Sequence, residues 1–540
     1  MVAEPGSSTA AEGLALAPWQ AALLVAGAVL VAYANSFSVP FQFDDRVVIL
    51  GEPAITGFHL DPSGRRFLGD LSFAVCYRVF GDRPAGYHAV NVAIHLANAL
   101  LVLWLARSLL RAHALLPTAR ARRDEAIPFV AALLFAVHPL QTQAVTYVAQ
   151  RYASLAAAFF LLATNAYVRF RLTRSRRASL GWYALFLGAA AAAAWTKENA
   201  FVLPLAIVLV EVAFFSAPAR RRLLFVAPFL LAAAAAVGWA AASGVTLERL
   251  DTATRIGDGI SRQDYALTQL RVVASYLRLL VLPVGQNLDP DVALSRSLLE
   301  PAVLLAAALH ATLVAAGVVM LRRGRRGDAL PSLAGFGILW FYVGLLVESS
   351  FIPIPDLMYE HRVYLPSAGL AVAAAAALAR VAPLARPRVR VAVTLGLAVS
   401  LTALTVARNR VWQSELALWS DSAAKSPNKP RPLNGLGTAL AAQGDLRGAI
   451  ALYERALRAD PSYAKAYFNL GEALQGLGEY AAAIPLYEWF LLRVPRYPDT
   501  YRNLAECYRR TGKAEAADRL DAMYARARLD SAGGLPPSLR

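Results

Sequence analysis

The chain has 540 residues, of which 57% are hydrophobic and only 17% are charged, and its mean hydropathy is +0.44. No single soluble core requires so many apolar residues, so the composition indicates many membrane helices. The net charge of +17 lies in short arginine clusters without any nucleic-acid-binding motif, which argues against an RNA or DNA partner. Two cysteines, Cys76 and Cys507, are too few for a disulfide framework or a cysteine-based metal site.

Apolar segments recur up to residue 408 and predict about eleven membrane helices. They lie approximately at 17–36, 86–106, 126–140, 144–167, 180–196, 199–216, 223–242, 301–321, 331–349, 362–381 and 391–408. Arginine-rich loops between them, such as 169–177 and 322–326, are expected in the cytoplasm by the positive-inside rule. The segment 265–283 is also apolar, but Arg271 and Arg278 share one helical face, so we expect an amphipathic helix in the outer interface.

From about residue 409 the sequence becomes that of a soluble helical domain with a repeat of 34 residues. Five series keep this period: Leu436, Leu470 and Leu504; Gly444, Gly478 and Gly512; Ala449, Ala483 and Ala517; Pro427, Pro461 and Pro495; Trp419, Tyr453 and Tyr487. The pattern predicts roughly three tetratricopeptide repeats after a half unit at 412–426. We therefore expect a membrane domain at 1–408 and a repeat domain at 409–540, whose concave surface suits a peptide or serves only as a rigid scaffold.

Polar side chains gather at the outward ends of the predicted membrane helices. Ionisable groups at a membrane face are energetically costly and are read as functional. The set comprises Asp44, Asp45, Arg78, His88, Asn91, His95, His138, Arg151, Lys197, Glu198, Glu360, His361 and Arg362. Charges confined to one face of the membrane fit an amphipathic substrate whose head group lies at that interface.

The adjacent carboxylates of Asp44 and Asp45 suit acid and base chemistry. Two neighbouring carboxylates disfavour simultaneous ionisation, so one can accept a proton while the other orients the acceptor or binds its backbone. The sequence does not assign which is which, and the pair could instead cap a helix or bind Arg46. A salt bridge between Lys197 and Glu198 is likewise a plain structural alternative to a functional role.

A metal site is the weaker interpretation of these residues. His88 and His95 are seven residues apart and share a helical face, where a packed, hydrogen-bonded histidine is common. Together with Asp44 and Asp45 they could in principle hold a divalent ion. Hard cations prefer oxygen ligands, however, and zinc ligands are usually closer in sequence, so we predict no metal.

Several sequence blocks resemble, in the same order, the transmembrane O-mannosyltransferases that carry tetratricopeptide repeats, and their bacterial relatives. The blocks are "FDD", "GYHAVNVAIHLANALLV", "FAVHPLQTQAVTYVAQRYASLAA", "WTKENAFVLPL", "VGQNLDPDVALSRSLLEP", "YEHRVYLPSAGL" and "ARNRVW". The resemblance implies an all-α fold, with a GT-C membrane helix bundle followed by a repeat α-solenoid. It also implies transfer of a sugar, mannose or another hexose, from a polyprenyl-phosphate donor to a protein acceptor. The enzyme would lie in the bacterial inner membrane, with its N-terminus in the cytoplasm and its repeats in the periplasm.

The resemblance also implies roles for the outer-face residues. Asp44 or Asp45 would be the base of an inverting transfer, and Asp44, the first of the pair, is favoured. Cations would stabilise the leaving phosphate without a metal cofactor. The phosphate-binding candidates are Arg151, Lys197, Arg362 and His361, and the supporting residues are Glu198, Glu360, His138, Arg78 and His88.

The chain departs from these relatives at one block. Where they tend to read "HPVHTEAV", this sequence has Leu140, Gln141 and Gln143, so an imidazole and a carboxylate are replaced by neutral groups. Either the sugar preference has shifted or the glutamate position is not catalytic. Two other functions compete: a non-catalytic membrane scaffold that recruits proteins, and a transporter of lipid-linked sugars. The scaffold leaves the polar cluster unexplained, and a transporter requires charges near the midplane.

Overall fold

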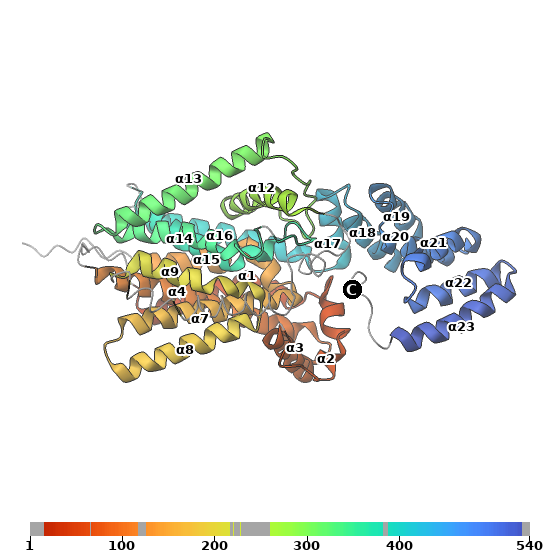
Figure 1. Ribbon diagram of the computed structural model, residues 1–540, viewed down its shortest axis with the longest axis horizontal. Helices are drawn as coiled ribbons and strands as arrows, with labels where there is room; N and C mark the ends of the chain where they lie inside the picture. Colours follow the sequence, from red (N-terminus) through yellow and green to blue (C-terminus); the bar gives the residue numbers. More distant parts are fainter. Residues whose placement is uncertain are drawn as a thin grey trace, which may run out of the picture. The chain divides into compact units, whose positions relative to one another are not determined.

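The computed structural model describes residues 16–531, apart from residues 65 and 351 and the segments 117–125, 217–219, 221–226, 228–259 and 382–386. All regular elements in this part of the chain are helices (Figure 1). The chain forms two compact units. The first comprises Met1–Phe41, Val48–Gln286 and Val292–Arg410, and the second comprises Gln42–Val47, Asn287–Asp291 and Val411–Arg540. The sequence placed both short segments of the second unit in the membrane domain.

The first unit is a bundle of long apolar helices. Its main elements are α1 (Pro18–Tyr33), α3 (Phe67–Phe80), α4 (Pro84–Ala114), α5 (Ala126–Val137), α7 (Arg151–Leu172), α8 (Arg176–Ala194), α9 (Leu203–Phe214), α12 (Arg262–Val281), α13 (Pro301–Gly324), α14 (Ala329–Leu345), α15 (Tyr364–Leu378) and α16 (Pro387–Val411). Short helices α2 (Pro53–Thr56) and α6 (Thr142–Val145) lie between them. Helix α7 packs against α4 and α8, and α14 packs against α13 and α15 (Figure 1).

Small residues let these helices approach closely. A Cβ atom at Gly337 of α14 would lie 2.1 Å from the carbonyl oxygen of Gly369 in α15. A Cβ atom at Gly335 would lie 2.5 Å from the carbonyl oxygen of Gly317 in α13. Close backbone contact replaces the hydrophobic effect as a source of helix association in lipid, so this pattern is typical of membrane bundles.

Several helices of the first unit are long and apolar enough to cross a membrane. Among the described residues these are Pro18–Ser36, Pro84–Ala114, Val148–Leu172, Pro301–Gly324 and Arg388–Val411. The pair Ala126–Val137 and Pro139–Val145, bent by 52°, adds a sixth if it forms one span. The protein is thus a multi-pass membrane protein, while the larger number of about eleven spans stays a prediction. The expected helix at 223–242 lies outside the described residues.

Helix α12 covers the ambiguous segment 265–283. Arg271 and Arg278 of this helix bind the chain that follows it. Arg271 donates to the carbonyl oxygen of Ala293 at 3.0 Å, and Arg278 donates to that of Val284 at 3.0 Å. The two charged side chains are therefore used to fasten the segment after the helix. Its position in the membrane interface stays a prediction.

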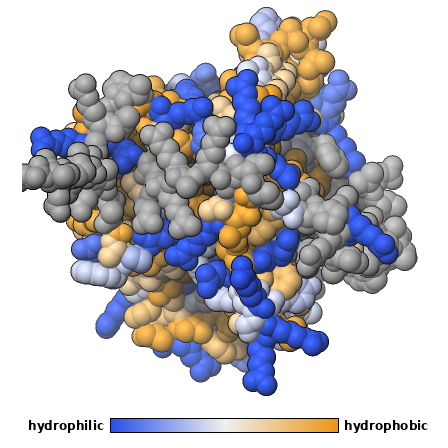
Figure 2. Space-filling model, turned by 90° about the vertical axis from the view of Figure 1, so that its left-hand side faces the viewer, coloured by the Kyte–Doolittle hydropathy of each residue, from blue (hydrophilic) through white to orange (hydrophobic). Residues whose placement is uncertain are grey.

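The arginine-rich turns of the first unit lie at one end of its helices. The turn between α7 and α8 and the turn between α13 and α14 are both at the left of Figure 1. Figure 2 looks onto that end and shows many hydrophilic side chains around it. This arrangement is the one that a common cytoplasmic side requires.

The second unit contains helix α17 (Glu415–Lys425) and three helical pairs. The pairs are α18 (Pro430–Ala442) with α19 (Leu446–Ala459), α20 (Ala464–Gly476) with α21 (Tyr480–Arg493), and α22 (Pro498–Arg510) with α23 (Ala514–Ser531). Gly444, Gly478 and Gly512 connect the helices of each pair with φ values of 89°, 80° and 81°. Glycine adopts this left-handed backbone without a steric penalty, which explains the 34-residue glycine series. The predicted tetratricopeptide fold is confirmed.

Another glycine of the repeats is required by packing. A Cβ atom at Gly471 in α20 would lie 2.8 Å from the Cε1 atom of Tyr487 in α21. The Tyr487 ring is fully buried and cannot easily move away. The absence of a side chain at Gly471 therefore allows the two helices of the second pair to cross.

We expect Gly471→Ala to lower the free energy of unfolding of the repeats by about 1–3 kcal/mol, because it overpacks the contact with Tyr487. Urea unfolding followed by circular dichroism would measure the change. Ala481→Ser, at an exposed position of α21, is the control and should shift stability by less than about 0.5 kcal/mol. Equal stability of the two variants would contradict this account of the crossing.

Candidate functional site

The candidate base lies in a tight turn of the second unit. The backbone N–H of Asp45 donates to the carbonyl oxygen of Gln42 at 3.0 Å, which closes the turn. The backbone N–H of Gln42 donates in return to the Asp45 carboxylate at 3.0 Å. Asp45 is buried and its carboxylate stabilises the turn, while Asp44 occupies the corner and is half-buried. The two carboxylates that the sequence left equivalent therefore have different surroundings.

The other short segment of the second unit contains a buried carboxylate that the sequence did not single out. Asp289 is 2% exposed and forms ion pairs with Lys429 and, at 3.5 Å, with Arg431. Lys429 also donates to the carbonyl oxygen of Pro290 at 3.0 Å. The side chain of Asn287 donates to Ser426 at 2.8 Å. These contacts hold the segment Asn287–Asp291 against the start of the repeats.

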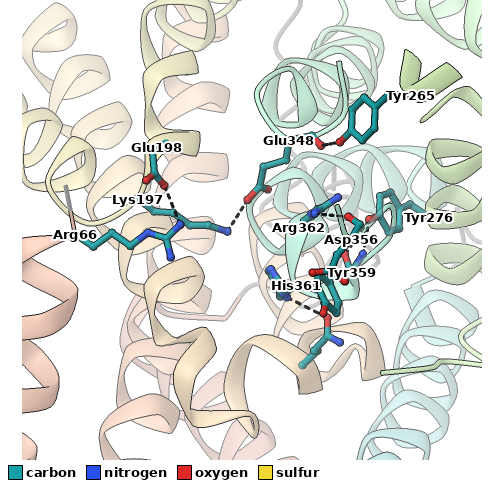
Figure 3. Close-up of polar contacts among 11 residues, drawn as sticks. Arg66, Lys197, Glu198, Tyr265, Tyr276, Glu348, Asp356, Tyr359, His361 and Arg362 are labelled. Atoms are coloured by element: carbon teal, nitrogen blue, oxygen red, sulfur yellow. Dashed lines mark hydrogen bonds and ion pairs between the residues drawn. The ribbon is translucent and has the colours of Figure 1, made fainter. Parts of the chain in front are cut away.

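A second polar cluster belongs to the first unit (Figure 3). The ammonium group of Lys197 lies 2.5 Å from a carboxylate oxygen of Glu348, and both side chains are buried. Glu198 pairs instead with Arg66 at 3.3 Å, where both side chains are partly exposed. Lys197 and Glu198 thus pair with Glu348 and Arg66, rather than with each other as the structural alternative from the sequence had it. Glu348 and Arg66 were both missed, because neither lies near its partner in sequence.

Arg362 lies in the same cluster and is held by the backbone before it. Its guanidinium donates to the carbonyl oxygens of Asp356, at 2.7 Å, and Leu357, at 3.3 Å. The charged group also lies over the Tyr359 ring, 5.7 Å from its centroid. Figure 3 shows Arg362 beside Asp356 and Tyr359, with Lys197 and Glu348 across from it. Both cations thus come together, although they are distant in sequence.

His361 lies beside Lys197 and Arg362 and binds Gln143, one of the residues at which this sequence differs from the "HPVHTEAV" block. Its backbone N–H donates to the side-chain oxygen of Gln143 at 2.7 Å, and its Nδ1 atom lies 3.2 Å from the same oxygen. Burial lowers the pKa of His361 well below its ordinary value, and Lys197 and Arg362 lower it further. The imidazole is therefore neutral at pH 7 and can donate a hydrogen bond but supplies no charge to a phosphate. The amide nitrogen of Gln143 is buried without a partner in the described part of the chain.

Arg151, the third predicted phosphate ligand, has different surroundings. It is fully buried, and its guanidinium donates to Asn91 at 2.6 Å, to the Cys76 sulfur at 3.1 Å and to the Tyr87 carbonyl oxygen at 3.1 Å. It also lies over the Phe73 ring at 4.5 Å. These contacts join α7 to α3 and α4. Phosphate binding by Arg151 stays a prediction.

The remaining candidates each have a partner of their own. His88 lies 2.9 Å from the carbonyl oxygen of Val39, His95 lies 2.7 Å from the Tyr364 hydroxyl, His138 lies 3.1 Å from the carbonyl oxygen of Leu280, Glu360 accepts from Gln286 at 3.3 Å, and Arg78 covers the Phe58 ring at 4.6 Å. No group of three histidine, cysteine or acidic side chains within the described ranges is close enough to hold a metal ion. Metal dependence and the supporting roles of these residues stay predictions.

We expect Glu348→Gln to lower the free energy of unfolding by about 3–5 kcal/mol, because it leaves the Lys197 charge buried and uncompensated. Combining it with Lys197→Met should restore much of the loss, and thermal unfolding in detergent would measure both. Arg66→Gln, which breaks the partly exposed pair with Glu198, is the control and should cost less than about 1 kcal/mol. If Glu348→Gln is as stable as the parent protein, the buried ion pair does not hold this cluster together.

Comparison with known proteins supports the repeats and identifies relatives. Two family models, described as TPR repeat and Tetratricopeptide repeat, match residues 437–478 and 472–530. A solved structure of ArnT from Cupriavidus metallidurans aligns over 88% of this chain and 79% of its own, with 16% identity and a TM-score of 0.39. That score is too low to carry an argument about fold or function.

Curated relatives match about a third of the chain. Protein O-mannosyl-transferase TMTC4 of Homo sapiens is 32% identical over 203 residues, which are 33% of this chain and 27% of that protein. Protein O-mannosyl-transferase Tmtc1 of Drosophila melanogaster is 33% identical over 202 residues, which are 34% of this chain and 21% of that protein. This chain thus spans about a quarter or less of the length of these relatives. It is a helical membrane protein with tetratricopeptide repeats, and about a third of its sequence is similar to protein O-mannosyl-transferases.

Proposed function

We propose that the protein is a membrane glycosyltransferase of the GT-C type. It transfers a sugar, mannose or another hexose, from a polyprenyl-phosphate donor to a hydroxyl group of a protein acceptor. Sequence similarity to the protein O-mannosyl-transferases supports the reaction class. The observation that carries the proposal is the turn at 42–45, where Asp45 binds the backbone and Asp44 occupies the half-buried corner.

The proposed reaction uses Asp44 as general base. The carboxylate accepts the proton of the acceptor hydroxyl, whose oxygen attacks the anomeric carbon of the sugar. The bond from that carbon to the phosphate oxygen breaks, and polyprenyl phosphate leaves with the electron pair. The attack is from the opposite side, so the configuration of the anomeric carbon is inverted. Asp45 takes no part in proton transfer and keeps the turn in shape.

Lys197 and Arg362 are the proposed ligands of the leaving phosphate. An ammonium group has three N–H donors and a guanidinium has five, so the described partners of these side chains leave capacity for phosphate oxygens. Cations that are already in position stabilise the negative charge that develops on the phosphate. Neutral His361 would add a hydrogen bond only. Glu348 would keep Lys197 extended in the absence of substrate.

The repeats are the proposed acceptor-binding surface. The first helix of each pair carries one asparagine: Asn469 and Asn503 occupy the same place in the second and third repeats, and Asn434 lies one residue before the equivalent place in the first. The Asn469 amide donates to Asn434 at 2.9 Å, and the Asn503 amide donates to Glu472 at 3.3 Å, so these side chains follow one another across the stack. Amide groups both donate and accept, which suits the main chain of an extended polypeptide.

We also propose that the protein lies in a bacterial inner membrane, with the N-terminus in the cytoplasm and the repeats in the periplasm. The grouping of the arginine-rich turns at one end of the first unit supports a common cytoplasmic side (Figures 1 and 2). The donor head group and the protein acceptor are then both expected on the periplasmic side.

Asp44→Asn should lower the transfer rate by about 10²- to 10⁴-fold, because it removes the proton acceptor. Purified protein in detergent would be supplied with a polyprenyl-phosphate hexose and a peptide, and the product would be quantified by mass spectrometry. Arg46→Gln, at an exposed position of the same segment, is the control and should retain the rate. Full activity of Asp44→Asn would exclude this base. Unchanged hexose on envelope proteins after deletion of the gene would favour the non-catalytic scaffold.

Asn469→Ala should raise the KM for a long polypeptide acceptor several-fold and leave the KM for the donor unchanged, because it removes a main-chain contact in the middle of the stack. Steady-state kinetics with the same peptide would measure both constants. Glu454→Gln, on the second helix of the first pair, is a matched control and should alter neither. An unchanged acceptor KM for Asn469→Ala would show that the acceptor binds elsewhere.

A further inference from the structure

We propose that the repeat unit itself positions the Asp44 turn, through contact of Phe43 with Trp419, so that the unit that binds the acceptor also presents the base. The assignment of Asp44 as base rests on the proposed function. Phe43 and Trp419 do not touch the substrates in this proposal and act only through the position of Asp44.

Two side chains fasten the turn to the start of the repeat domain. The fully buried side chain of Gln42 donates to the carbonyl oxygen of Trp412 at 3.0 Å. The Phe43 ring packs edge to face against Trp419 of α17, with 5.5 Å between centroids and 81° between planes. Asp44 follows directly, so both anchors lie within two residues of the proposed base. A displacement of either anchor moves the carboxylate.

The backbone of the turn requires such anchoring. Phe43 has a φ of 50°, in the left-handed region that residues with a side chain rarely adopt. Strained conformations of this kind persist where surrounding contacts enforce them, and they concentrate at functional sites. Here the Asp45 carboxylate accepts a hydrogen bond from the backbone of Gln42 within the turn, and the Phe43 ring packs against Trp419 of α17.

The charge environment links the turn to the proposed acceptor surface. Burial lowers the pKa of Lys465, in the first turn of α20, and the negative charge of Asp44 opposes this shift, so the two groups interact. Asn469 is four residues further along α20, and residues at this spacing share one helical face. One face of α20 therefore carries both the residue that interacts with the base and the central asparagine of the acceptor surface.

The test compares kcat and KM in the full-length protein. Phe43→Ala should lower kcat about 10- to 100-fold with the donor KM unchanged, because a carboxylate displaced by about 1 Å loses its alignment. Phe43→Tyr keeps the ring and should restore most of the rate. Trp419→Leu should cause a similar loss, and the double variant should lose no more than either single variant, since both act through one contact.

The outcomes separate this inference from the proposed function. If Asp44→Asn is inactive but Phe43→Ala keeps the parent kcat, the positioning role is wrong and the proposed base stands. If the losses of Phe43→Ala and Trp419→Leu multiply in the double variant, the two residues do not act through a common contact and the inference also fails. If Asp44→Asn keeps full activity, the proposed base itself is wrong. Unfolding of the repeats should be unchanged in Phe43→Ala, because Phe43 lies outside the helical pairs.

Discussion

A charge that is taken out of water must find a partner, and this constraint shapes every part of the candidate site. An isolated buried ion costs several kcal/mol, so buried charges are paired or hydrogen-bonded. Lys197 meets Glu348, Asp289 meets Lys429, and Arg151 is surrounded by groups of α3 and α4. Such pairs fix the ends of helices and the loops between them with little freedom. They also bring cations into defined positions before any substrate binds.

The same constraint divides the two carboxylates of the first loop. Asp45 satisfies the backbone N–H of Gln42, which would otherwise be buried inside a strained turn. Asp44 remains at the corner and is half-buried, and its negative charge opposes the lowering of the Lys465 pKa by burial. The two members of a pair that looks symmetrical in sequence therefore have different surroundings, and only Asp44 is the proposed base. In the first unit, the neighbours His361 and Arg362 also differ, since the first is neutral and the second is cationic.

Local and periodic features were predictable from the sequence, whereas partners across long separations were not. The 34-residue period predicted the helical pairs, and in the structure the periodic glycines Gly444, Gly478 and Gly512 occupy turns with positive φ. Nothing in the sequence pointed to Glu348 as the partner of Lys197, since 151 residues separate them. The membership of Gln42–Val47 in the repeat unit was equally hidden, because it depends on contacts with residues about 370 positions later.

Helix α20 has a consequence for how this domain can diversify. An α-helix turns by about 100° per residue, so Lys465 and Asn469, with three residues between them, lie on one face of α20. Substitution of the intervening residues leaves that alignment intact, but inserting one residue among them rotates the amide by about a further 100° around the helix, away from the charged group. Two of these three residues, Ala466 and Phe468, are buried in the repeat core, so the stretch is constrained in its chemistry as well as in its length.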